Sequence, residues 1–196
     1  MLETTVDHLI HNVLPAAADY SAAERVLTQT FSTDNTPTAW DAAARTAKRR
    51  AAEVAIAIDA LTDRCYGELG LTKAVVRNDI SALCVWPGSI TARAGAHDRI
   101  RGVSNAYKHQ NLNDPALPIT SENDVLVVGS GWGADAYGVG KYGGVPEVLV
   151  LETAGQMWKF LGDVPTAIAA WFRFIAATGV ILPLGPFEVC GLQVHP

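Results

Sequence analysis

The chain has 196 residues, of which 49% are hydrophobic and 18% charged, and its formal net charge is -5. This length fits one domain, and the negative charge argues against broad, non-specific nucleic-acid binding while still allowing a local basic pocket. The three cysteines are widely spaced and include no C-x-x-C pair, so neither a disulfide framework nor a zinc site is indicated and a reducing cytoplasm is the expected location. The acidic N-terminus does not resemble a signal peptide, and without a run of about 18 apolar residues no membrane span is expected.

Three helices are predicted first. One covers residues 6–14 and ends at Pro15, and the next begins at Ser21, which has capping-box spacing to Glu24. A longer helix starts at Thr38, because its apolar residues alternate in steps of four and three over roughly 28 residues. This stripe consists of Trp40, Ala44, Ala47, Ala51, Val54, Ile58, Leu61 and Cys65. The many alanines predict close approach by another helix, and the low charge adds the expectation of a homodimer or other homo-oligomer.

The second half of the chain changes in character. Helices are expected over about 72–85 and up to His109, followed by strands over 125–128, 148–151 and 156–161. A last helix over about 166–178 would be capped by Asp163 and ended by Gly179, and the tail would lie extended across the body. The predicted fold class is α+β in a single domain 1–196: a mainly α-helical bundle (1–112), a small three-stranded antiparallel β-meander (120–162), and a closing C-terminal helix with an extended tail (163–196).

The glycine-rich segment around Gly129, Gly131 and Gly133 resembles the start of a dinucleotide-binding unit. That unit needs a helix directly after the turn, but four more glycines and Pro146 follow, which a helix tolerates poorly. Two interpretations stay open. The segment is a long hairpin connection packed down by aromatic side chains, or it is a flap over the polar helix described next, in which Trp132, Tyr137 and Tyr142 contact a ligand together with Lys108.

A polar stripe marks the helix that ends near His109. Helical period places Asp98, Arg101, Asn105 and Lys108 on one face, with His109 slightly to one side. His109 is suited to acid–base work, Arg101 to holding a phosphate or a developing negative charge, and Asn105 to orienting either. Alternatively, these side chains form a solvated or internally paired surface. His8 and His11 are three residues apart but are not part of a metal-ligand motif, so no metal and no cofactor is expected.

The stretch from Arg101 to Asn105, Lys108 and His109, preceded by an alanine-rich helix, resembles the R…N-x-x-K-H stretch of HEPN-like bacterial helical proteins. The HEPN superfamily (higher eukaryote and prokaryote nucleotide-binding) includes ribonucleases of toxin and phage-defence systems. In its nuclease members an Arg and a His, separated by four to six residues, act from one helix of each protomer across a dimer. Here seven residues separate Arg101 from His109. The resemblance covers about residues 40–112.

Two functions follow from these patterns. The first is a non-catalytic helical protein that self-associates and binds a small ligand or a partner protein. The second is a HEPN-like ribonuclease or phosphate-handling enzyme that uses Arg101, Asn105 and His109 as catalytic residues. A small anionic ligand or RNA is the expected partner of such a site.

Overall fold

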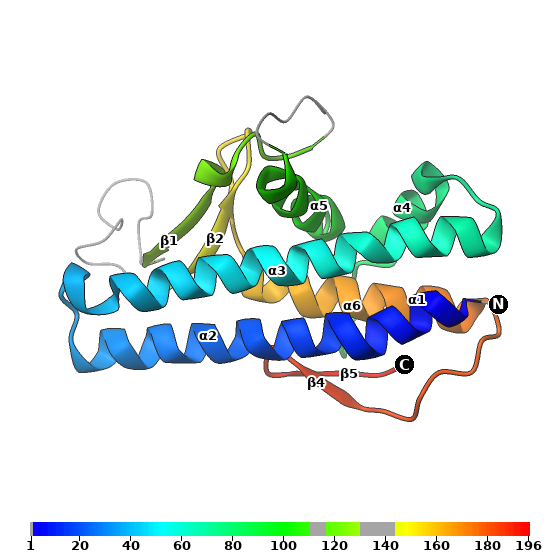
Figure 1. Cartoon of the computed structure of the whole chain (residues 1–196), viewed down its shortest axis with the longest axis horizontal. Helices are drawn as coiled ribbons and strands as arrows, with labels where there is room; N and C mark the ends of the chain where they lie inside the picture. Colours follow the sequence, from blue (N-terminus) through cyan, green and yellow to red (C-terminus); the bar gives the residue numbers. More distant parts are fainter. Residues whose placement is uncertain (1, 110–116, 130–143) are drawn as a thin grey trace.

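Two long antiparallel helices form the centre of the molecule. The computed structural model describes residues 2–109, 117–129 and 144–196. Helix α1 (Glu3–His8), a π-helical turn (Leu9–Val13) and α2 (Leu14–Thr33) follow one another as a continuous helical run. Helix α3 (Pro37–Leu69) then returns along α2 for almost the whole length of the molecule (Figure 1).

The apolar stripe of α3 packs inside its own chain. Ala47, Ala51, Val54, Ile58 and Leu61 are fully buried, and α3 makes its most extensive helix contact with α2. Alanine leaves little bulk between the two backbones, so the helices approach closely. The predicted close packing against a helix is confirmed, and the partner helix is α2.

Pro15 does not end the first helix, contrary to the prediction. It lies in the first turn of α2, directly after the π-helical turn, in which the Leu14 N–H donates to the Leu9 carbonyl. Proline is tolerated near the start of an α-helix because the N–H groups there have no partner within the helix, and the wide turn separates the two α-helical registers. Ser21 is therefore an interior residue of α2 and not the start of a new helix.

Three shorter helices pack around this pair. They are α4 (Lys73–Ala82), whose Thr72 Oγ1 accepts the Val75 N–H at 3.3 Å, α5 (Ala96–Lys108) and α6 (Phe160–Ala177). Within the described part of the chain, α6 alone is long and apolar enough to cross a membrane, and most of it is buried inside the fold. Its fully buried Trp171 and Phe172 place it at the centre of the core.

The strands form an antiparallel meander, as predicted. Strand β1 (Val125–Gly129) pairs with β2 (Pro146–Leu151), and β2 pairs with β3 (Met157–Lys159). Gly129 lies opposite Pro146, so the strands that flank the glycine-rich segment run antiparallel, whereas a dinucleotide-binding unit has parallel strands. The third strand is shorter than predicted because α6 begins at Phe160.

The tail also departs from the expected extended path. Strands β4 (Phe187–Val189) and β5 (Leu192–Val194) form a hairpin that contacts α2 and α6 (Figure 1). Cys190 and Gly191 form its two-residue turn, with φ of 50° and 78°. Positive φ at both positions is what a tight hairpin with normal strand twist requires.

Candidate functional site

The side chains of the predicted polar stripe of α5 lie in different surroundings: one pairs within α5, one pairs with α3, and one is half-buried. Arg101 is buried, and its Nη1 donates to Asp98 Oδ1 at 3.2 Å on the same helix. Lys108 extends to α3, where its Nζ lies 3.0 Å from Asp59 Oδ2. Asn105 is half-buried, and its carbonyl accepts the N–H of His109 at 2.9 Å. Within the stripe, Lys108 pairs with α3, whereas Arg101 pairs with Asp98 on α5 itself.

Arg101 and His109 are apart in the portion of the chain that the structure describes. His109 is exposed at the end of α5 and lines a hollow of about 380 Å³ together with Tyr107, Lys108 and residues 120–123. Arg101 does not contribute to that hollow. Trp132, Tyr137 and Tyr142, the predicted ligand contacts of the glycine-rich segment, lie outside the described residues.

A buried histidine lies on the same helix, one turn before Arg101. His97 is fully buried, its Nδ1 lies 3.4 Å from Ser81 Oγ on α4, and its Nε2 has no hydrogen-bond partner among the residues that the structure describes. Burial lowers the pKa of His97 from 6.5 to about 4, with smaller effects of the charges on Asp98 and Arg101. The ring is therefore neutral at physiological pH, as part of the core.

Two buried arginines share one carboxylate where α5, β3 and α6 meet. Asp163 accepts from Arg93 Nε at 2.5 Å and from Arg99 Nε at 2.8 Å and Nη2 at 2.9 Å. Arg99 Nη1 also donates to Glu152 at 2.8 Å, and its guanidinium lies 4.2 Å from the centroid of the Trp158 ring. Asp163 is thus a buried ion partner inside α6, and the prediction that it caps the helix is wrong.

Gly162 provides the space for this network. A Cβ atom there would lie 2.8 Å from the Trp86 ring and 3.0 Å from the Arg93 guanidinium, whose central carbon is 4.6 Å from the Trp86 centroid. The absence of a side chain lets the arginine and the tryptophan pack directly on α6. Because its charges are paired with one another, we interpret the network as structural.

A second buried carboxylate is held differently. Glu24 of α2 is 5% exposed, and its Oε1 accepts the Tyr20 hydroxyl at 2.7 Å and the Val148 N–H of β2 at 3.0 Å. Its Oε2 accepts no hydrogen bond from the described parts of the chain. Glu24 is therefore fixed through one oxygen and keeps the other available.

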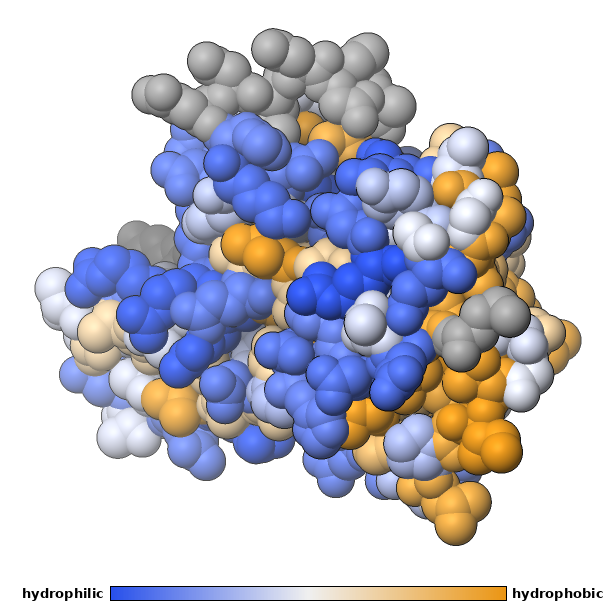
Figure 2. All heavy atoms as spheres, turned by 45° about the vertical axis from the view of Figure 1, so that its right-hand side comes forward, coloured by the Kyte–Doolittle hydropathy of each residue, from blue (hydrophilic) through white to orange (hydrophobic). Residues whose placement is uncertain are grey.

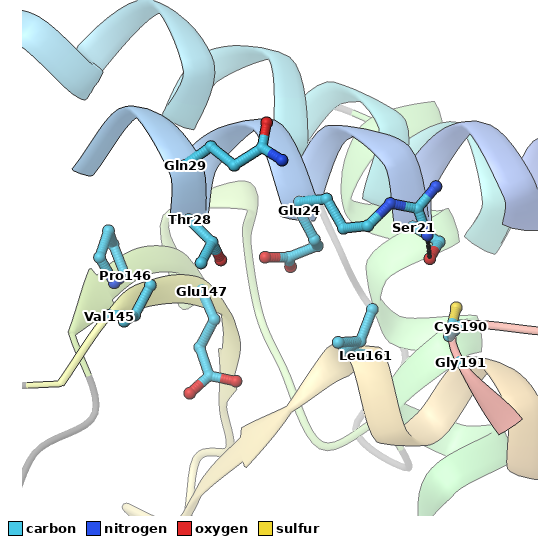
Figure 3. A pocket seen from close by; sticks show the side chains of 11 residues that line it. Ser21, Glu24, Thr28, Gln29, Val145, Pro146, Glu147, Leu161, Cys190 and Gly191 are labelled. Carbon is cyan, nitrogen blue, oxygen red and sulfur yellow. Dashed lines mark hydrogen bonds between the residues drawn. The ribbon is translucent and has the colours of Figure 1, made fainter. Parts of the chain in front are cut away.

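The free oxygen of Glu24 belongs to a cleft of about 410 Å³. Figure 3 shows the Glu24 carboxylate pointing into the space between α2 and the start of β2, where Val145 and Pro146 lie, with Leu161 of α6 beside it. The turn of the β4–β5 hairpin, at Cys190, lies on the same side. Four elements that are distant in sequence thus build one partly apolar site.

Burial is the main influence on the acidity of Glu24. It raises the pKa of the Glu24 carboxyl, and the hydrogen bonds from Tyr20 and Val148 act in the opposite direction. The charges on Glu147 and Lys159 have smaller, opposing effects. A carboxyl of raised pKa, open to a cleft, is suited to exchanging a proton or to pairing with a cation.

The sequence also indicates that Glu24 is buried, although its spacing from Ser21 predicted a helix cap. Val13, Ala17, Tyr20, Glu24 and Leu27 follow one another in steps of four and three, which is the buried stripe of α2. A glutamate on such a stripe must find partners inside the protein or face a site.

Compared with protein families, with curated proteins and with solved structures, the chain shows no match.

Proposed function

We propose that this chain is a small-molecule-binding protein whose site is the cleft between α2 and the start of β2. The observation that carries the proposal is the Glu24 carboxylate: the residue is 5% exposed, and its Oε2 faces the cleft without a partner among the described residues. A largely buried carboxylate is costly unless its oxygens are paired, and a polar group that is held in place and opens to a cleft is what small-molecule sites provide. The cleft volume lies within the usual range for small-ligand sites.

A tryptophan placed in the cleft tests this proposal. Thr28 is exposed and lines the cleft, so Thr28→Trp should fill the cleft without disturbing the core, whereas Thr33→Trp adds the same bulk near the end of α2, away from the cleft. In an NMR screen of an amine, alcohol, amide and carboxylate fragment set, we expect fragments that bind the wild type and Thr33→Trp but bind Thr28→Trp roughly tenfold more weakly or not at all. Fragments that bind Thr28→Trp as well as the wild type, or no binding by any fragment, would contradict the proposal.

Self-association stays a prediction, but the surface expected to contact a second copy is no longer the alanine stripe of α3. The alanine stripe is buried against α2 and cannot also serve a second copy. Other apolar side chains are exposed on the segment after α6, where Ile181 and Leu184 are 94% and 98% exposed. Figure 2 shows apolar residues gathered toward this end of the molecule. Light scattering at micromolar concentration measures whether the chain is a dimer.

A second candidate function is the HEPN-like ribonuclease or phosphate-handling enzyme. The observation in its favour is the exposed hollow that His109 shares with Lys108 and with the hydroxyl-bearing residues Thr120 and Ser121. Since Arg101 is buried and lies outside this hollow, such an enzyme would use His109 and Lys108 without Arg101.

Substitution of His109 decides this candidate. If the chain is a nuclease, purified protein should cleave single-stranded RNA, and His109→Ala should lower the rate at least about a hundredfold, as expected for loss of a general acid or base. His11→Ala is the matched exposed control. Intact RNA after incubation with the wild type, or equal rates for wild type and His109→Ala, would rule the candidate out.

A further inference from the structure

Resting on the proposed function, we infer that the cleft takes a small organic cation: a protonated amine or amidine attached to an apolar body. The argument begins with the two oxygens of Glu24. Tyr20 and Val148 both donate to Oε1, and hydrogen bonds of this kind favour the ionised carboxylate. When Glu24 is ionised, the cleft therefore presents Oε2 as an acceptor, and the ligand has to supply the donor.

A charged donor fits this position better than a neutral one. Burial penalises the ionised form of Glu24, which is why its pKa is raised. A ligand cation beside Oε2 offsets that penalty, and charge-assisted hydrogen bonds are about twice as strong as neutral ones. A neutral donor would leave the buried charge without a counter-ion.

The other charges at the cleft do not replace the missing counter-ion. Arg25 is exposed, and its Nη1 donates to Ser21 Oγ at 3.2 Å. Lys159 lies outside the cleft, with its Nζ 2.7 Å from Glu147 Oε1. The carboxylate of Glu147 turns away from that of Glu24 (Figure 3), but it adds a second negative charge to the lining. An anionic ligand at Oε2 would therefore be repelled by the Glu24 carboxylate, whose oxygens no cation bonds among the described residues.

The walls of the cleft define the rest of the ligand. Val145 and Pro146 on one side and Leu161 on another are apolar, and they surround the approach to Glu24. Ser21, Thr28 and Gln29 of α2 add polar groups to the lining. Apolar walls with a few placed polar groups are typical of sites that bind a small molecule by its body and orient it by its polar end. A single aromatic or short aliphatic group carrying an ammonium ion matches this arrangement.

Three ligands of similar shape and different charge test the inference. Benzylamine, benzyl alcohol and benzoate would be titrated by calorimetry into the wild type, Glu24→Gln and Glu188→Gln. Glutamine can keep the hydrogen bonds from Tyr20 and Val148 while placing an amide N–H₂ in the position of Oε2. Glu188→Gln removes the same charge from an exposed position on β4 that does not line the cleft.

We expect the wild type and Glu188→Gln to bind benzylamine roughly tenfold or more tightly than benzyl alcohol, and Glu24→Gln to lose that preference. We also expect Glu24→Gln to unfold at the same or a higher temperature than the wild type, so that lost binding is not lost folding. Tighter binding of benzyl alcohol or benzoate, blocked by Thr28→Trp, would overturn the cation inference and leave the proposed function standing. No binding by any of the three would also overturn it, and if the whole fragment set failed as well, the proposed function would fall too.

Discussion

Asp163→Asn is expected to lower the free energy of unfolding by about 3–5 kcal/mol, the range found when one partner of a buried ion pair is removed. Arg93 and Arg99 are 7% and 1% exposed, and both donate to this carboxylate. Asparagine keeps the shape but removes the charge, which leaves two buried guanidinium groups with only Glu152 as a carboxylate partner within the network. Since domains of this size are stable by about 5–15 kcal/mol, the variant would approach the limit of folding.

Urea denaturation with linear extrapolation measures this loss. Asp63→Asn is the matched control, because Asp63 pairs with Lys73 on the surface, and exposed pairs contribute at most about 1 kcal/mol. If Asp163→Asn fails to fold, Glu152→Gln gives an intermediate test, since it weakens only the contact with Arg99 Nη1. Equal, small losses in Asp163→Asn and Asp63→Asn would show that the network does not hold the junction of α5, β3 and α6 together.

The second large effect is a loss of stability in acid that depends on His97. The folded state holds the pKa of His97 at about 4, whereas an exposed histidine protonates near 6.5. Because the unfolded chain binds this proton more readily, the contribution of His97 is fully present above pH 6.5 and is lost as the pH falls to 4. At about 1.4 kcal/mol per pKa unit, the expected loss is about 3 kcal/mol.

Comparison with a variant that has no titratable group at position 97 isolates the contribution of His97 to the free energy of unfolding. In His97→Asn an amide can approach Ser81 in place of the ring Nδ1, and the variant should begin less stable than the wild type because it leaves a small cavity. The difference between the two should then shrink between pH 6.5 and 4, since the other groups around the ring, which include Asp59, Arg77, Asp98 and Arg101, are common to both. A constant difference across this range would show that His97 is not held neutral. His11→Asn, on an exposed ring, is the control expected to follow the wild type.

Much of the architecture was readable from periodicity. The steps of four and three in α3 predicted a long helix with one buried stripe, and the short apolar runs after Val125, separated by glycine-containing connections, predicted the meander. These signals are local, since a helix or hairpin repeats its burial pattern along its own sequence. Pro15 shows the limit of local signals, because only the π-helical turn before it lets the helical run continue.

The candidate site was less predictable, because its chemistry is assembled from distant segments. The spacing of Ser21 and Glu24 fits a capping box, and only the Val148 N–H, 124 positions away, shows that Glu24 is instead a buried acceptor. In the same way, Asp163 looks like a helix cap until Arg93 and Arg99 are seen beside it. Arg101, Asn105 and Lys108 share the predicted stripe, but the ion pair of Lys108 with Asp59 belongs to the contact between α3 and α5.

Titration of the Glu24 carboxyl by ¹³C NMR, in the absence and presence of saturating benzylamine, is the most direct test of the cleft as a cation site. Tyr20, Glu147, Lys159 and Arg25 surround this carboxyl in both states, so a change in its pKa reports on the ligand. If the ammonium group pairs with Oε2, benzylamine should lower the pKa of Glu24 by about one unit for each tenfold preference for the ionised site. A Glu24 pKa that is the same with and without benzylamine, or that rises, would contradict the account.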